Sequence, residues 1–168
     1  EFRIVSPITG LLADKTLRAH DQPIARLANG EVVAHESLIR LAVGHAVRNP
    51  EELFHAAREQ GLLVRVEQAC LDEGIRTWIR QGSRLLFLNL SAFAVVEMVD
   101  RLTATGVAQA LEAAGVSPSS LVIEITEQDA VGDISRLIHS ATQIRACGVK
   151  FALDDYGEGH TRLRSWAG

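Results

Sequence analysis

Two apolar stretches late in the chain decide the fold, because residues 121–126 read LVIEIT and residues 149–154 read VKFALD. Both are short runs rich in apolar and β-branched residues, which favour strands. The segment between them carries apolar residues at helical spacing: Ile134, Leu137, Ile138, Ala141 and Ile144. A strand, a helix and a second strand in this order predict an α/β fold with a parallel sheet and helical crossovers.

The alternation continues toward the N-terminus. Residues 84–90 predict another strand, and residues 95–114 predict a mostly helical segment. Asn49 and Pro50 have the residue types of a helix start, so we expect a helix to about Gln60. The dipeptide at 29–30, Asn-Gly, lies between two extended runs and predicts a β-hairpin. We expect residues 1–20 to form a linker or N-terminal extension, with a short helix as the alternative.

The composition excludes several classes of protein. The 168 residues are 47% hydrophobic with a net charge of −4, which favours one folded domain and makes binding to DNA or a membrane surface a poor hypothesis. The most apolar stretch, residues 85–99, is interrupted by polar residues and is shorter than the ~20 apolar residues that a membrane span needs. Cys70 and Cys147 form no Cys-x-x-Cys pair, which favours free thiols and a cytoplasmic location.

Polar residues interrupt the apolar strands near their ends. They are Glu36, Asn89, Glu124 and the pair Asp154-Asp155. In a sheet built of βα units the carboxyl ends of the strands meet at one edge, where ligands bind. For each acid taken alone, a structural role as hydrogen-bond acceptor or ion-pair partner is the alternative. Taken together, carboxylates gathered at one edge need a cation to stay ionised.

The chemistry of these donors favours particular metals. All of them are oxygen ligands, which suits Mg²⁺ or Mn²⁺ better than zinc. The adjacent Asp154 and Asp155 could span two ions, and two ions ~3.5–4 Å apart are the usual device for in-line displacement at phosphorus. The residues alone therefore point to phosphodiester hydrolysis.

The order and the residues of these segments resemble those of the EAL family of cyclic di-GMP phosphodiesterases. Five ordered segments carry the resemblance: QPI at 22–24, ESL at 36–38 followed by Arg40, NLS at 89–91, EITE at 124–127 and LDDYG at 153–157. A single Glu-x-Leu would carry no information, whereas five matches in order across most of the chain are specific.

The resemblance implies a TIM-like (β/α) barrel whose first strand is antiparallel to the rest, and metal-dependent hydrolysis of cyclic di-GMP to 5′-pGpG. It also assigns roles to residues of this sequence. One ion would be held by Glu36, Asn89, Glu124 and Asp154, and a second would be shared by Asp154 and Asp155. Glu36, Asp154 and Asp155 would thus be catalytic.

Other roles implied by the resemblance concern substrate and a nearby loop. Gln22 and Arg40 would contact the dinucleotide, and Leu38 would pack against a guanine. Glu127 would anchor the loop at residues 156–161, which in the family couples dimerisation to metal binding. The family also implies further sensor or signalling domains in the parent protein.

Length and four substitutions separate this chain from the family pattern. A complete barrel takes ~250 residues, so we expect residues 21–168 to be the N-terminal portion of an EAL-type domain, truncated after about the fifth strand. The later segments, which in the family carry a lysine and a glutamate, are then absent. Ser37 replaces an alanine and His35 an aromatic residue, while Glu158 replaces a threonine and Arg162 a small residue.

Two questions therefore stay open at this stage. The chain is a phosphodiesterase portion with little activity of its own, a degenerate module that binds cyclic di-GMP or a protein partner without catalysis, or an inert fragment. An incomplete barrel also leaves an open sheet edge, from which we expect a homodimer or a strand-exchanged assembly.

Overall fold

The computed structural model describes residues 7–14, 16–42, 47–81, 85–126 and 134–154. Strands and helices alternate along most of the chain, which confirms the predicted α/β class. The chain divides into two compact units, residues 1–88 and residues 89–168. The sequence shows no boundary between them, because no Pro/Gly-rich or charged linker separates the two units.

A β-hairpin forms the first part of the N-terminal unit. Strand β1 (Leu17–Ala25) pairs antiparallel with β2 (Val32–Leu41), and β2 pairs in parallel with β3 (Leu86–Asn89). The first strand is thus antiparallel to the second, as predicted. The predicted Asn-Gly turn closes the hairpin, with Gly30 at φ +71° and the Arg26 N–H donating to the Glu31 carbonyl at 2.8 Å.

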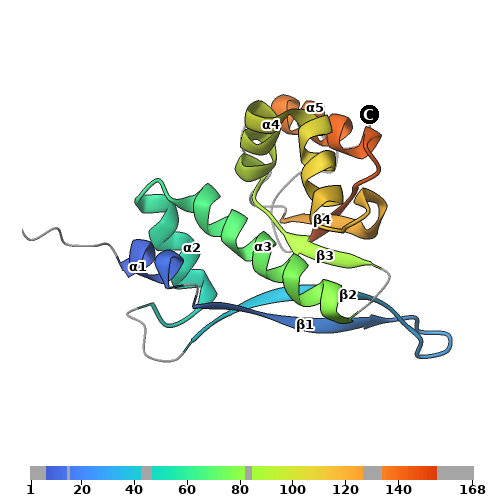
Figure 1. Ribbon diagram of the computed structural model, residues 1–168, viewed down its shortest axis with the longest axis horizontal. Helices are drawn as coiled ribbons and strands as arrows, with labels where there is room; N and C mark the ends of the chain where they lie inside the picture. Colours follow the sequence, from blue (N-terminus) through green and yellow to red (C-terminus); the bar gives the residue numbers. More distant parts are fainter. Residues whose placement is uncertain (1–6, 15, 43–46, 82–84, 127–133, 155–168) are drawn as a thin grey trace, which may run out of the picture. The chain divides into compact units, whose positions relative to one another are not determined.

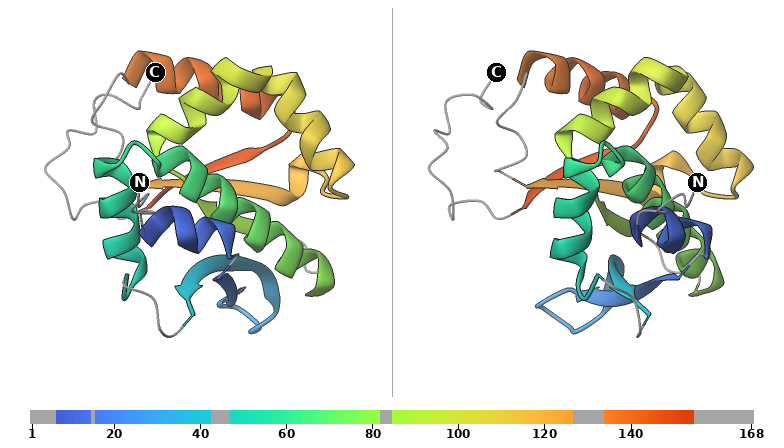
Figure 2. Two further views of the ribbon diagram at one scale, coloured as in Figure 1. Left: turned by 60° about the vertical axis from the view of Figure 1, so that its left-hand side comes forward. Right: turned by 90° about the vertical axis from the view of Figure 1, so that its left-hand side faces the viewer.

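Three helices complete the N-terminal unit: α1 (Pro7–Ala13), α2 (Pro50–Glu59) and α3 (Leu63–Gln81). The predicted cap of α2 is confirmed, since the Asn49 side-chain oxygen accepts a hydrogen bond from the Glu52 N–H at 2.8 Å. Helix α3 lies along the β1–β2 ribbon (Figure 1), and α1 lies beside α2 (Figure 2). These elements enclose one apolar core, formed by Ile8, Leu11, Leu17, Leu53, Ala57, Val66 and Cys70.

Residues 7–14 and 16–20 contain regular structure. The short helix α1 matches the alternative expected for this stretch, and β1 already begins at Leu17. Leu17 is buried in the core together with Ile8 and Leu11 of α1. Burial of these apolar side chains stabilises a segment whose weak local pattern does not specify structure by itself.

The C-terminal unit contains α4 (Ala92–Ala113), the 3₁₀ turn η1 (Pro118–Ser120), β4 (Leu121–Thr126), α5 (Ile134–Ala146) and β5 (Lys150–Asp154). Helix α4 is interrupted at Thr103, which has φ 60°. The Thr103 hydroxyl caps the second half of the helix by accepting a hydrogen bond from the Gly106 N–H at 3.2 Å. Helices α4 and α5 pack side by side (Figure 2).

Strands β4 and β5 pair in parallel, with Glu124 level with Ala152 and Thr126 level with Asp154. This is the strand-helix-strand unit predicted from the sequence. Within the described ranges β5 has no strand partner besides β4, so the sheet is open at β5 and does not close into a barrel in this part of the chain.

Both cysteines are free thiols, as expected, with Cys70 buried and Cys147 half-buried. Burial, reinforced by the neighbouring Glu67 carboxylate, raises the pKa of Cys70 to about 12, so this thiol is not a reactive nucleophile near neutral pH. None of the helices in the described segments is long and apolar enough to cross a membrane.

Candidate functional site

Four of the predicted ligand-binding residues lie on one face of the β1–β2 ribbon. Gln22 is directly opposite Glu36 in the antiparallel register. Side chains alternate between the two faces of a strand, so Leu38 and Arg40 lie on the same face as Glu36. Gln22 and Arg40 are exposed, whereas Glu36 and Leu38 are half-buried. This face presents an amide, a carboxylate, an apolar side chain and a guanidinium group in one row.

Arg18 is an additional cation on this face that the sequence did not indicate. The register places Arg18 directly opposite Arg40, and both side chains are exposed. Each guanidinium donates to the carbonyl of the residue before it, at 2.8 Å and 2.9 Å. Two like charges at directly opposite positions destabilise a ladder unless an anion offsets them. The pair was not predictable because Arg18 precedes the stretch that the sequence assigns to the strand.

The opposite face of the ribbon carries a buried polar cluster of Asp21, His35 and Ser37. Asp21 lies directly opposite Ser37, and Gly74 of α3 approaches the Ser37 hydroxyl from above. Both Asp21 carboxylate oxygens, His35 Nδ1 and Ser37 Oγ are buried, and no hydrogen bond within the described residues satisfies them. Burial raises the pKa of Asp21 above its usual value, while His35, Ser37 and His20 oppose this shift.

Asp21→Asn is expected to stabilise the protein near pH 7 by about 1 kcal/mol, because it removes a charge that the fold partly buries. The folded-state pKa of Asp21 is raised, so the stability that its carboxyl contributes is present below the unfolded-state pKa of about 4 and is lost as pH rises through the folded-state pKa. Urea unfolding of both proteins at pH 7 and at about pH 3.5 measures this difference.

The gain from Asp21→Asn should be much smaller at the acidic pH, where the carboxyl is mostly protonated in both states. Asp14→Asn, at an exposed carboxyl in the same unit, is the control and should leave stability unchanged within about 0.5 kcal/mol. A loss of stability at pH 7 in Asp21→Asn would show instead that the carboxylate makes a favourable interaction in the folded protein.

Three predicted metal ligands lie at the carboxyl ends of strands in the C-terminal unit. Asn89 ends β3, Glu124 lies in the second half of β4 and Asp154 ends β5. The Leu90 N–H donates to the Glu124 carbonyl at 3.0 Å, which in a parallel pair brings Asn89 level with Glu124. Glu124 is level with Ala152, so the alternation of β5 puts Asp154 on the same face.

The donor set on this edge fits a hard divalent cation. Asn89, Glu124 and Asp154 offer amide and carboxylate oxygens, the ligands of Mg²⁺, Mn²⁺ and Ca²⁺, and no thiol or imidazole that would favour zinc. Over the described ranges, no three His, Cys, Asp or Glu side chains lie close enough to hold an ion by themselves. Asp155 and Glu127 lie outside the described residues, as does the loop at 156–161.

Comparison with known proteins now decides the family. The profile of the family described as "EAL domain" matches residues 8–168. The chain belongs to the EAL domain family. This confirms the resemblance drawn from the five sequence segments.

One similar protein is MucR of Pseudomonas aeruginosa, which is named a bifunctional diguanylate cyclase/cyclic di-GMP phosphodiesterase. The two sequences are 29% identical over 171 residues, and the alignment covers 97% of this chain and 24% of MucR.

Solved structures of EAL domains share the fold. The PaMucR phosphodiesterase in its c-di-GMP complex superposes with a TM-score of 0.73 at 28% identity, over 89% of this chain and 64% of that one. The BlrP1 protein of Klebsiella pneumoniae in a manganese/cy-diGMP complex has a TM-score of 0.72 at 26% identity, over 89% of this chain and 37% of that one. The predicted EAL-type fold is thereby confirmed, and the EAL chain spans under two thirds of each of these solved chains.

Proposed function

We propose that this EAL chain supplies part of a divalent-metal-dependent site that binds cyclic di-GMP and hydrolyses it to 5′-pGpG. The observation that carries the proposal is the alignment of Asn89, Glu124 and Asp154 on one face at the carboxyl ends of their strands. The c-di-GMP and manganese complexes of similar EAL structures support the substrate class and the use of a divalent ion.

Our assignment of the metal ligands follows the family pattern and the donor chemistry. One Mg²⁺ or Mn²⁺ ion would be held by Glu36, Asn89, Glu124 and Asp154, and a second by Asp154 and Asp155. When bound, such ions polarise the phosphodiester and lower the pKa of a bound water. The chain's own carboxylates then fix where the ions lie and keep the charge of the site balanced.

The face of the β1–β2 ribbon that carries Gln22, Glu36, Leu38 and Arg40 is suited to hold the dinucleotide. In our proposal Gln22 binds through its amide, and the Leu38 side chain packs against a guanine. Arg40, together with the opposite Arg18, orients a phosphate through charge-assisted hydrogen bonds.

The proposed setting is second-messenger signalling in the bacterial cytoplasm, with further sensor or signalling domains in the complete protein and a homodimer as the assembly. The multidomain name of the Pseudomonas relative supports the expectation of further domains. We also propose that Glu127 anchors the loop at 156–161, as the family pattern implies. Residues 21–168 would be the N-terminal portion of the domain, preceded by an extension at 1–20.

Mn²⁺ titration calorimetry tests the metal site. The chain is expected to bind Mn²⁺, and Glu124→Gln should weaken binding at least about tenfold, because it removes a charged oxygen ligand and hence ~1.4 kcal/mol or more of binding free energy. Glu112→Gln, on the exposed surface of α4, is the matched control and should bind like the unmodified chain. Equal affinity in Glu124→Gln would overturn the ligand assignment.

A second candidate function is binding of cyclic di-GMP without hydrolysis. It is favoured by Glu158, which stands where the family pattern has a threonine. Chromatography of cyclic di-GMP incubated with the chain and Mn²⁺ separates the two functions. Product that is lost in Glu36→Ala supports hydrolysis, whereas bound but uncleaved dinucleotide supports the receptor function.

A further inference from the structure

The roles carried over from the family leave out one side chain on the proposed dinucleotide-binding face of the β1–β2 ribbon. His20 belongs to this face, because it lies two residues from Gln22 in β1 and directly opposite Leu38 in β2. Side chains two residues apart in a strand, and side chains directly opposite each other, stand on the same side of a sheet. The β1–β2 register alone fixes this placement.

The neighbours of His20 are the residues proposed to contact the ligand. Leu38 is directly opposite, and Cβ atoms at such positions of an antiparallel pair lie ~4.5–5.5 Å apart. Gln22 is the next residue of β1 on this face, and Arg40 is a diagonal neighbour in β2, within reach of long side chains. A dinucleotide that touches Gln22, Leu38 and Arg40 therefore passes over His20.

The imidazole of His20 is available to a ligand. The residue is exposed, and within the described segments no hydrogen bond engages either ring nitrogen. By contrast, the guanidinium groups of Arg18 and Arg40 each donate to a backbone carbonyl. The imidazole has at least one N–H donor in either of its charge states. It can therefore donate to a ligand without breaking a hydrogen bond of the fold.

The position of His20 along the ribbon favours a base as its partner over a phosphate. Arg18 and Arg40 form the next pair on this face, toward the carboxyl end of β2, and supply the cations for a phosphate in the proposed function. Leu38, which shares a register pair with His20, is the residue proposed to pack against a guanine. The imidazole therefore lies beside that base.

We propose that His20 is a specificity-determining residue, whose ring N–H donates a hydrogen bond to the acceptor edge of the guanine that packs against Leu38. Guanine offers the acceptors O6 and N7 on this edge, whereas adenine carries an amino donor in place of O6. An N–H directed at this edge favours guanine and meets a second donor in adenine. The inference rests on the proposed function, because it names how that site would select its base.

Equilibrium dialysis of the 168-residue chain against cyclic di-GMP and cyclic di-AMP tests the proposal. Ca²⁺ is present as the divalent ion, since oxygen ligands also bind it, and chromatography checks that the dinucleotides stay intact. His20→Leu should raise the dissociation constant roughly tenfold for cyclic di-GMP, because the donor is lost, and no more than about twofold for cyclic di-AMP. His20→Gln keeps an N–H donor and should stay within about threefold of the unmodified chain for cyclic di-GMP.

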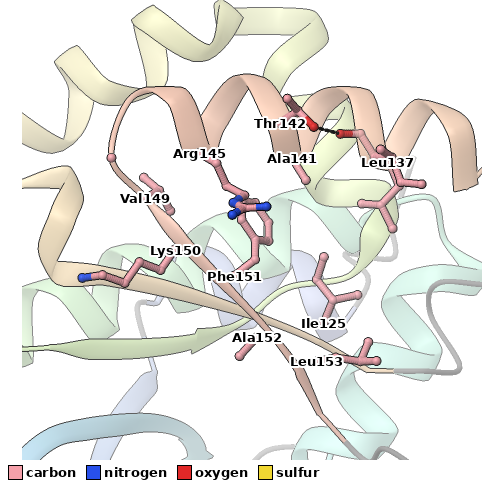
Figure 3. A pocket seen from close by; sticks show the side chains of 12 residues that line it. Ile125, Leu137, Ala141, Thr142, Arg145, Val149, Lys150, Phe151, Ala152 and Leu153 are labelled. Atoms are coloured by element: carbon pink, nitrogen blue, oxygen red, sulfur yellow. Dashed lines mark hydrogen bonds between the residues drawn. The ribbon is translucent and has the colours of Figure 1, made fainter. Parts of the chain in front are cut away.

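Two control variants separate this position from other histidines and other surfaces. His55→Leu makes the same change at an exposed histidine of α2 and should leave both dissociation constants unchanged. The groove between α5 and β5 is the alternative place for a base, because Arg145 and Phe151 both line it and such side chains stack on bases (Figure 3). Arg145→Ala should likewise leave binding unchanged.

The outcomes distinguish this inference from the proposed function. No binding of cyclic di-GMP by the unmodified chain would overturn the proposed function and, with it, the role of His20. Unchanged binding in His20→Leu, an equal loss for both dinucleotides, or a His20→Gln variant as weak as His20→Leu would each overturn the role of His20 alone. A loss in Arg145→Ala would place the dinucleotide in the groove of the C-terminal unit and overturn it as well.

The Mn²⁺ titration separates a base contact from a metal ligand. His20 is also a diagonal neighbour of Glu36, so an imidazole bound to the ion is the competing explanation for weaker dinucleotide binding. His20→Leu should bind Mn²⁺ like the unmodified chain. A loss of Mn²⁺ affinity of about tenfold in this variant would make His20 a metal ligand and would overturn its assignment to the base.

Discussion

Gly74→Val is expected to lower the free energy of unfolding by about 3 kcal/mol or more. Helix α3 crosses the ribbon at Gly74, where an added Cβ would lie 2.7 Å from Leu88 Cδ2 and 2.8 Å from Ser37 Oγ. Both neighbouring side chains are buried, at 4% exposure each, so neither can move aside without disturbing the core. Overpacking costs typically ~1–3 kcal/mol, and the two methyl groups of valine extend the clash beyond Cβ.

The helix propensity of the new residue does not offset this clash. Glycine within a helix costs about 1 kcal/mol relative to alanine. In Gly74→Ala this gain in helix propensity offsets part of the stability lost through the clash of the new Cβ, so it should be the milder variant. Gly10→Ala is the matched control, because nothing lies within 4 Å of a Cβ at that helical position. Chemical denaturation of the three variants should rank them with Gly10→Ala the most stable and Gly74→Val the least.

A double variant identifies the clash as the cause. Ser37→Ala removes the hydroxyl that a Cβ at residue 74 would meet, so Ser37→Ala/Gly74→Ala should be more stable than the sum of the single effects by at least about 0.5 kcal/mol. The alanine of the family pattern at residue 37 would thus be compatible with a larger residue on α3. Strict additivity would instead assign the cost of Gly74→Ala to the contact with Leu88.

The elements that the sequence specified correctly are those with strong local signals. Asn49 and Pro50 start α2 where predicted, because the cap hydrogen bond and the proline φ angle depend only on neighbouring residues. The run at 121–126 is a strand, since its apolar residues Leu121, Val122, Ile123 and Ile125 are buried on both faces of a sheet. Local chemistry therefore sufficed for the α/β class and for the strand ends that carry Glu124 and Asp154.

Features that depend on tertiary contacts were not predictable. The register that sets Gln22 opposite Glu36, and Arg18 opposite Arg40, is fixed by pairing across the hairpin and not by either strand alone. The polar face with Asp21 was missed because alternation in a strand shows which residues share a face but not which face is buried. The break of α4 at Thr103 has no proline or glycine at that residue to indicate it.

Leu53→Ala is expected to lower the free energy of unfolding by about 2–5 kcal/mol. Leu53 lies on α2 and is fully buried, at 0% exposure, in the core that joins α1, α2, α3 and β1. Truncation removes the transfer free energy of the lost carbon atoms and leaves a cavity that rigid neighbours fill only partly. Ile8 and Val66, also at 0% exposure, belong to the same buried cluster, so the site has little room to collapse.

The same chemical change at Leu27 is the matched control. Leu27 lies in the hairpin turn of the same unit and is fully exposed, so Leu27→Ala removes no buried contact and should change stability by no more than about 0.5 kcal/mol. Urea unfolding followed by circular dichroism compares the two variants with the unmodified chain. Similar small losses in both variants would mean that α1 and Leu17 do not pack in one cluster with Leu53 as the structure has them. A large loss confined to Leu53→Ala therefore supports both the core and the place of α1 and Leu17 in it.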